Sequence, residues 1–231
     1  MKFYGIQKLS LVDYDTEVSC TLFARGCNMR CPFCHNFELV VYNEDFSVPI
    51  PDEDIKNYLI LHNNRLSAVV ITGGEPTLDP TLEEMCDYIK GLGYKIKLDT
   101  NGTNPEVVIR LIKKGLIDYI AVDIKNSKEE YSKTVGVENF NTDKIDGTIR
   151  YLIHHDFPYE FRTTLVNEFH TLESIEEMGK WINGASTLFL QHFKQSDFVP
   201  NKSLTEVPTK NALEMRRILE KYVKNVNLRG Y

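Results

Sequence analysis

Short apolar segments rich in β-branched and aromatic residues alternate along the chain with longer segments whose apolar residues recur every three or four positions. The first pattern is typical of buried strands, and the second of helices that pack one face on a core. Six segments are predicted strands, with a weaker seventh near the end of the chain: Val18–Ala24, Ala68–Thr72, Tyr94–Asp99, Tyr119–Asp123, Tyr159–Leu165, Thr187–His192 and Asn225–Arg229.

Helices are predicted between these strands because start signals precede the periodic segments. Acidic residues follow Pro51, and Asn104-Pro105 places a proline at the first position of a helix, where its missing N–H costs nothing. The predicted helices run from Pro51 to about Asn63, from Leu82 to Gly91, from Pro105 through Ile112, and over Asp143–His154, Thr171–Ile182 and Thr209–Tyr222.

The regular alternation predicts an α/β fold, because parallel strands need a crossover, which is usually a helix. A closed barrel of eight such units takes about 250 residues. With six clear units in 231 residues, we expect a partial (β/α)6 TIM-like barrel whose parallel sheet is open on one side. A doubly wound open sheet is the alternative. No linker or repeat divides the chain, so residues 1–231 are predicted to form a single domain.

Charge and cysteine usage narrow the functional classes. The chain has 27 Lys and Arg against 33 Asp and Glu, a net charge of −6, which argues against nucleic acid and membranes as partners. We see no secretory signal or membrane-spanning run and expect a cytoplasmic location. In such a reducing compartment, clustered cysteines are more often metal ligands or catalysts than disulfides. Three of the five cysteines fall within eight residues.

Polar residues follow the predicted strands at their carboxyl ends, where both candidate folds place functional sites. They are Gly73, Gly74 and Glu75; Asp99, Thr100 and Asn101; Asp123 and Lys125; Arg162; and Gln191 and His192. The carboxyl ends of parallel strands meet at one edge of a sheet. The pattern therefore predicts a binding cleft formed by these residues.

The cysteine cluster, Cys27, Cys31 and Cys34, offers three thiolates in a Cys-x3-Cys-x2-Cys pattern. A structural zinc site normally closes with four ligands. A [4Fe–4S] cluster held by three cysteines keeps one iron open to a small molecule. His35 adjoins Cys34 and is poorly placed to reach the same metal. The two other cysteines are interpreted as core residues, and a noncatalytic zinc- or iron-binding module remains the alternative.

The motif resembles that of the radical S-adenosylmethionine (SAM) superfamily. Phe33 occupies the aromatic position before the last cysteine, and Gly73-Gly74-Glu75-Pro76 follows one strand–helix unit later. The resemblance implies that the three cysteines hold a [4Fe–4S] cluster whose open iron binds the amino and carboxylate groups of SAM. It also implies that the Gly-Gly-Glu-Pro segment meets the amino group of SAM.

Two stretches, Leu98–Gly102 and Val122–Lys125, look like the pattern of activating enzymes of glycyl radical enzymes. Two others, Ser10–Tyr14 and Cys31–Asn36, look most like the activating protein of anaerobic ribonucleoside-triphosphate reductase. Asp15-Thr16 departs from the Pro-Gly that relatives often carry. The resemblance implies a SAM pocket lined by Asp99, Thr100, Asn101 and Asp123. Asp99 is expected to face the SAM ribose or a monovalent cation, and Asp123 to lie beside that cation. The Asp99–Gly102 stretch could instead be an ordinary turn.

The resemblance further implies that Lys125 and Arg162 face the SAM carboxylate and that Gln191 or His192 lies near the substrate. The implied reaction is reductive cleavage of SAM to a 5′-deoxyadenosyl radical, which removes hydrogen from a glycine of a partner enzyme. A one-electron donor such as flavodoxin or ferredoxin is implied as well. A radical enzyme acting on a small molecule of deazapurine type, or on a ribosomal peptide, is the alternative within the superfamily.

Overall fold

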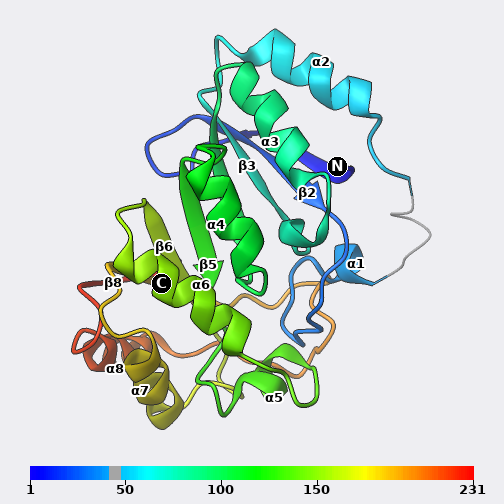
Figure 1. The fold of residues 1–231 in the computed structure, drawn as a ribbon. Helices are drawn as coiled ribbons and strands as arrows, with labels where there is room; N and C mark the ends of the chain where they lie inside the picture. The colour runs from blue at the N-terminus through cyan, green and yellow to red at the C-terminus, as the bar shows by residue number, and fades with distance from the viewer. Residues whose placement is uncertain (42–47) are drawn as a thin grey trace. The chain divides into compact units, whose positions relative to one another are not determined.

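The computed structural model describes residues 1–41 and 48–231. Its eight strands are hydrogen-bonded in chain order, so that β1 and β8 are the two ends of an unclosed sheet (Figure 1). The strands are β1 (Phe3–Ser10), β2 (Ser19–Ala24), β3 (Ala68–Gly73), β4 (Lys95–Thr100), β5 (Tyr119–Asp123), β6 (Tyr159–Leu165), β7 (Thr187–His192) and β8 (Asn225–Arg229). The pairs β2–β3, β3–β4, β6–β7 and β7–β8 are parallel, whereas β1–β2 is antiparallel. The expected open α/β sheet is confirmed.

The chain divides into two compact units, each described below by itself. Unit 1 comprises Met1–Asn28, Glu38–Thr100 and Asn104–Ile120, and unit 2 comprises Met29–Phe37, Asn101–Thr103 and Ala121–Tyr231. The interpretation of residues 1–231 as one domain stays a prediction.

Unit 1 has its core where β2, β3 and β4 carry fully buried side chains, among them Leu22, Ile71 and Ile96. Its helical segments are α2 (Asp52–His62), η2 (Pro76–Leu78), α3 (Leu82–Gly91) and α4 (Pro105–Lys113). The helix α3 buries Met85, Cys86 and Ile89 along one side, as the spacing of its apolar residues predicts. Pro105 is the first residue of α4, also as predicted.

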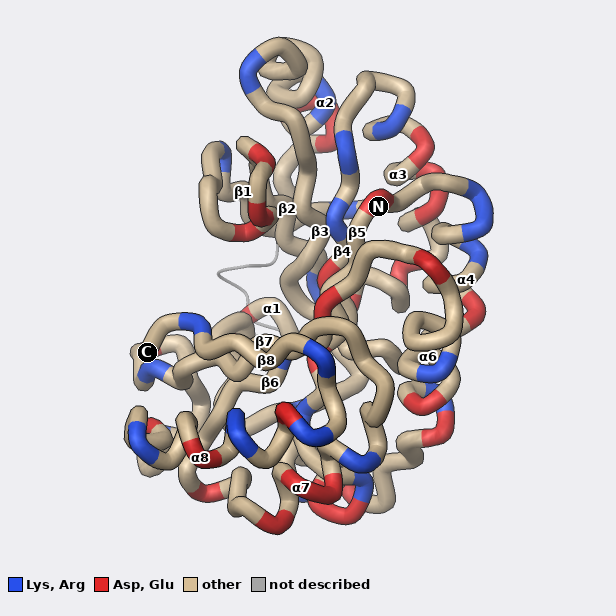
Figure 2. The backbone as a smooth tube through the Cα atoms, turned by 90° about the vertical axis from the view of Figure 1, so that its left-hand side faces the viewer, with Lys and Arg blue, Asp and Glu red and all other residues tan. Residues whose placement is uncertain are grey.

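Unit 2 contains α5 (Tyr131–Val135), α6 (Asp143–His154), α7 (Leu172–Trp181) and α8 (Thr209–Leu219). A capping box starts α7: the Thr171 hydroxyl accepts the Ser174 N–H, and the Ser174 hydroxyl accepts the Thr171 N–H. The helices α7 and α8 lie side by side (Figure 1). Both helices carry acidic and basic residues (Figure 2).

All seven predicted strands and all six predicted helices are present, and β5 to β8 have the predicted bounds. The sequence analysis missed β1, α1 (Phe37–Val40), α5 and η2. The strand β1 lacks a clear apolar alternation because its second half, Gln7–Leu9, is exposed. The short helices span too few turns to show a period. Across the described ranges, every helix is too short or too polar to cross a bilayer.

Candidate iron–sulfur and cofactor site

The two glycines at the end of β3 allow two backbone segments of unit 1 to touch. A Cβ atom on Gly73, whose φ is +114°, would lie 2.3 Å from the carbonyl oxygen of Ala24. A Cβ atom on Gly74 would lie 2.0 Å from that of Gly26. The Gly74 N–H donates to Ala24 (2.9 Å), and the Glu75 N–H donates to Gly26 (2.7 Å). The glycines therefore position the segment that leads into the cysteine loop.

The Glu75 side chain joins η2 to the end of β4. Its carboxylate is buried and accepts the Thr77 N–H (3.1 Å), the Thr77 hydroxyl and the Thr100 hydroxyl (2.7 Å). Asn104 donates in turn to the Thr77 hydroxyl (2.9 Å). A buried carboxylate with several donors is well compensated for its lost hydration. Glu75 and Thr100, both predicted site residues, thus also support the architecture of unit 1.

The stretch after β4 contains a turn. The Asn101 side-chain oxygen accepts the N–H (3.1 Å) and the hydroxyl (2.7 Å) of Thr103. Gly102 has a φ of +77°, and its carbonyl accepts the Thr148 hydroxyl (2.7 Å). This is the turn chemistry expected of Asn and Gly. Asn101 therefore stabilises the turn in which it lies. Asp99, one residue before the end of β4, is half-buried.

Cys31 and Cys34 lie in a tight turn of unit 2, in which the Cys34 N–H donates to the Cys31 carbonyl (3.1 Å). Cys31 is 8% exposed. Burial raises the pKa of the Cys34 thiol, whereas the Asn36 N–H and the charge of Lys125 oppose that rise. Cys27 belongs to the end of unit 1, and all five cysteines of the chain are free thiols.

The cysteine loop is anchored to the rest of unit 2 at several points. The Arg30 N–H donates to the Val135 carbonyl (2.8 Å). The glycine that ends α5, Gly136, has a φ of +65°, and a Cβ atom there would lie 2.4 Å from the Arg30 carbonyl oxygen. The buried ring of Phe33 packs 5.8 Å from that of Phe169. These contacts fix the backbone on both sides of Cys31.

The side chain of His35 contacts the segment that follows β7. Its Nε2 atom is hydrogen-bonded to the Lys194 carbonyl (2.8 Å), and its ring lies 5.7 Å from the Phe193 ring. The sequence analysis excluded His35 as a fourth ligand because it adjoins Cys34. In the structure this histidine fastens the end of the loop to the segment that follows β7.

Asp123, Lys125 and Arg162 form one ionic group in unit 2. Lys125 Nζ lies 3.0 Å from one carboxylate oxygen of Asp123, and Arg162 Nε lies 2.9 Å from the other. Burial opposes ionisation of Asp123, but the two cations outweigh it and lower its pKa to about 2. Burial likewise opposes the charge on Lys125, but Asp123 and Cys31 raise its pKa. All three side chains are therefore charged near neutral pH.

The backbone of Lys125 is clamped by two buried side chains that the sequence analysis missed. The Lys125 N–H donates to the Tyr131 hydroxyl (3.3 Å). His170 is buried and is hydrogen-bonded to the Lys125 carbonyl through Nε2 (2.9 Å). The neighbouring Asn126 is fully buried and donates to the Thr134 hydroxyl (3.0 Å). No local pattern identifies these residues, because each acts through a distant segment.

Gln191 and His192 point to opposite faces of β7. Thr164 pairs with Gln191 in the register, and their side chains meet at 3.5 Å, on the face that also carries Arg162. His192 instead places Nε2 3.2 Å from the Glu206 carboxylate. The structure therefore brings Gln191, and not His192, to the face that carries the ionic group.

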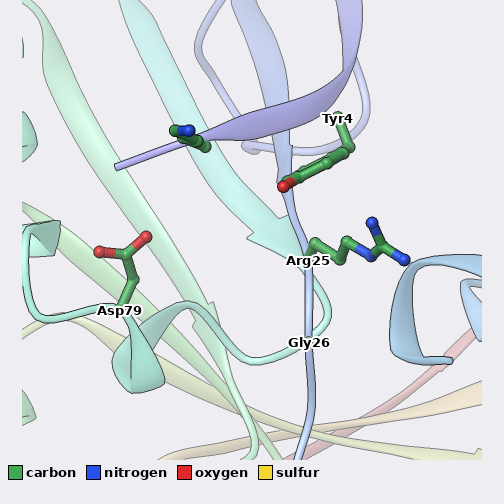
Figure 3. A pocket seen from close by; sticks show the side chains of 5 residues that line it. Tyr4, Arg25, Gly26 and Asp79 are labelled. Carbon is green, nitrogen blue, oxygen red and sulfur yellow. The ribbon is translucent and has the colours of Figure 1, made fainter. Parts of the chain in front are cut away.

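A hollow of about 400 Å³ lies in unit 1 beside the start of the cysteine loop (Figure 3). It is lined by Lys2, Tyr4, Arg25, Gly26 and Asp79. The guanidinium carbon of Arg25 lies 5.2 Å from the centre of the Tyr4 ring, a cation–π contact. The sequence analysis did not identify this hollow, because two of its residues come from the unpredicted strand β1 and its approach.

The donor set of the loop fits an iron–sulfur cluster. Thiolates are the ligands that such clusters use. Two of the three thiols lie on an anchored turn, where the charge of Lys125 opposes the rise that burial causes in the pKa of Cys34. Among the described residues, no group of three or more His, Cys, Asp and Glu side chains is arranged to hold a single metal ion.

Comparison with known proteins identifies the family. "Putative glycyl-radical enzyme activating enzyme MJ1227" of Methanocaldococcus jannaschii is 34% identical over 97% of this chain and 94% of its own length. A second protein of that organism, "Putative glycyl-radical enzyme activating enzyme MJ1632", is 27% identical over 90% of this chain and 79% of its own.

The fold is also found in a solved structure, Streptococcus suis SuiB bound to S-adenosylmethionine. That structure matches with a TM-score of 0.69 at 15% identity, over 90% of this chain and 49% of its own. The model of the Radical SAM superfamily matches residues 21–182, which include most of β2, the cysteine loop and the strands β3 to β6. Membership implies a [4Fe–4S] cluster and SAM as cofactors, and the chain belongs to the radical SAM superfamily of enzymes.

Proposed function

We propose that this protein is an activating enzyme that uses SAM to generate a glycyl radical on a partner enzyme. The observation that carries the proposal is the match to MJ1227 along 97% of the chain, together with the three-cysteine loop that this chain contains. MJ1227 and MJ1632 each match nine-tenths or more of the chain, and both have activating-enzyme names. These two relatives do not favour the small-molecule alternative.

In this proposal, Cys27, Cys31 and Cys34 hold the cluster. When bound, a reduced cluster and SAM supply the one-electron chemistry that releases methionine and a 5′-deoxyadenosyl radical. The residues proposed to line the SAM site are Phe33, Gly73, Gly74, Glu75, Asp99, Thr100, Asn101, Asp123, Lys125 and Arg162. These residues bind and orient SAM and exclude competing reactants, whereas the cofactors carry the chemistry.

The charged residues have separable roles within this site. Arg162 and Lys125 share the Asp123 carboxylate, and in this proposal the two cations attract the SAM carboxylate. The planar guanidinium suits a second, bidentate contact, whereas the ammonium acts as a point charge. Asp99 and Asp123 are the proposed ligands of a monovalent cation. Gln191, on the same face as Arg162, is the better placed of the two candidate substrate residues.

The proposed partner is anaerobic ribonucleoside-triphosphate reductase, and the proposed electron donor is a flavodoxin or a ferredoxin. The likeness of Ser10–Tyr14 and Cys31–Asn36 to activating proteins of that reductase supports the first assignment. A loop of such a partner has to leave its own fold to reach the site, so the complex is expected to be transient.

The first test is iron loading. Anaerobic reconstitution should give a brown protein, and Cys31→Ala should abolish the colour because it removes a thiolate ligand. Cys86→Ala is the matched control: Cys86 is fully buried on α3, so the variant should stay brown. Retention of one zinc and no iron under these conditions would refute the enzyme assignment.

The second test is activation. The reconstituted protein, reduced in the presence of SAM and the reductase, should produce a glycyl radical detectable by electron spin resonance. Formation of 5′-deoxyadenosine without a radical on the reductase would keep the superfamily assignment and reject this partner.

A further inference from the structure

We propose that His35 is a positioning residue for the iron–sulfur cluster, because its side chain holds the Cys34 end of the cysteine turn against the loop between β7 and α8. This β7–α8 loop comprises residues 193–208, and all the contacts concerned lie within unit 2. The inference rests on the proposed function only in that a cluster occupies the cysteine loop. It gives the β7–α8 loop a role in retaining that cluster.

The turn that contains Cys31 and Cys34 is attached to other segments on both sides. Before it, the Arg30 N–H donates to the carbonyl of the last residue of α5 (2.8 Å). After it, His35 Nε2 lies 2.8 Å from the Lys194 carbonyl oxygen, and because a carbonyl can only accept, Nε2 carries the proton and donates. Adjacent Cα atoms are about 3.8 Å apart, so the position of His35 limits that of Cys34. The second attachment uses a side chain and can therefore be removed by substitution.

A further hydrogen bond joins the turn to the β7–α8 loop. The Asn201 N–H donates to the carbonyl of Pro32, which lies between the two cysteines (3.1 Å). The β7–α8 loop is in turn attached to the segment that follows β6, since the Glu168 carboxylate accepts the N–H (3.0 Å) and the hydroxyl (2.5 Å) of Thr205. The loop therefore contacts the cysteine turn at two points and is itself attached elsewhere in unit 2.

The β7–α8 loop is also closed by hydrogen bonds of its own. The Lys202 ammonium donates to the carbonyls of Ser196 (3.0 Å) and Asp197 (2.8 Å). Phe193 at the start of the loop is fully buried, and its ring lies 5.7 Å from that of His35. Because these contacts restrict the loop, a hydrogen bond to it restricts the histidine as well.

The size of the expected effect follows from the exposure of His35, which is in contact with solvent. One hydrogen bond contributes only a modest net free energy, because water replaces it when it breaks. Without this bond the turn should open more often and otherwise keep its structure. Variants at this position should therefore still load iron and lose it faster.

The test is the rate of iron loss from the reconstituted protein under argon, without SAM or partner, after addition of the chelator bathophenanthroline. His35→Phe keeps an aromatic ring and removes the hydrogen bond, so iron loss should be about fivefold faster. His35→Gln places an amide donor at a similar reach and should bring the rate back to within about twofold of the wild type. This rescue separates the hydrogen bond from the shape of the ring.

The matched control is His155→Phe. His155 is also exposed, is hydrogen-bonded to the Tyr151 carbonyl through Nδ1 (2.8 Å) and stacks on the Tyr151 ring. Its partner belongs to α6, so the same substitution should leave the rate of iron loss unchanged. An unchanged rate in His35→Phe, an equal change in His155→Phe or no recovery in His35→Gln would overturn the proposal.

A second variant keeps the proposal open to refutation if His35→Phe does not load iron. Lys202→Met removes the two hydrogen bonds that close the β7–α8 loop and should also speed iron loss. An unchanged rate in Lys202→Met would refute the role of the loop. Failure of the proposed function is distinguishable, because it appears in the wild type as a lack of iron loading or of a glycyl radical. Failure of this inference appears only when the variants are compared.

Discussion

The charge state of Asp123 is expected to affect the stability of the fold, because this site residue is paired with two cations. Its carboxylate is 28% exposed and lies between two cations, which lower its pKa to about 2. A carboxyl whose pKa is lower in the folded protein stabilises the fold at pH values above its unfolded pKa of about 4. That contribution is lost as the pH falls toward 2.

The expected consequence is measurable in the iron-free protein. Asp123→Asn should lower the free energy of unfolding by about 2 kcal/mol at pH 7, and its difference from the wild type should shrink between about pH 4 and pH 2. Urea unfolding at a series of pH values measures this. The exposed residue Asp156 provides the control, since Asp156→Asn should change stability by less than about 0.5 kcal/mol. A difference that persists unchanged at acidic pH would contradict the assignment.

At the scale of elements, the contact between the end of β3 and the end of β2 depends on the absence of a side chain. Gly74→Ala would place a Cβ atom 2.0 Å from the Gly26 carbonyl oxygen, and that obstacle is backbone. We expect a loss of roughly 1–3 kcal/mol in unfolding free energy, as for other overpacked sites. The displaced segment leads into Cys27, so iron loading should fall as well.

The control for this prediction lies in the same unit. Gly91 ends α3, and a Cβ atom there would meet nothing within 4 Å. Gly91→Ala should therefore leave iron loading unchanged and raise stability by up to about 1 kcal/mol, because alanine favours helix. Thermal or urea unfolding distinguishes the two variants. Equal unfolding free energies and equal iron loading in the two variants would show that the close approach at Gly74 affects neither stability nor the cysteine loop.

The elements themselves were largely predictable. Strands β5 to β8 and helix α6 have the predicted bounds, because each is a periodic apolar segment between clear breakers. The missed strand β1 pairs antiparallel with β2 at the end of the sheet and has a largely exposed second half. A strand in that position needs no strong apolar pattern, so its sequence does not reveal it.

At the scale of the whole molecule, cofactor binding and folding are linked. A group that binds only the folded chain raises its stability by mass action, by about 2.7 kcal/mol at one hundred times the dissociation constant. For a chain of this length we expect the thermal midpoint to rise by roughly 5–10 °C on anaerobic reconstitution. The Cys31→Ala variant should show no such rise, whereas Cys86→Ala should show it. Scanning calorimetry under argon measures the difference.

The sequence by itself determined the alternation of strands and helices, the three-cysteine motif and the order in which polar residues follow the strands. These properties are local, since each depends on spacing within one short segment. Only the tertiary structure decided which residues act on one another. It showed that Gly73 faces the backbone of β2 and Gly74 that of Gly26, that His170 and Tyr131 hold the backbone of Lys125, and that Gln191 and His192 point apart. These contacts join segments that are far apart in the chain. Packing and the register between strands select the residues that touch, and no local sequence pattern predicts them.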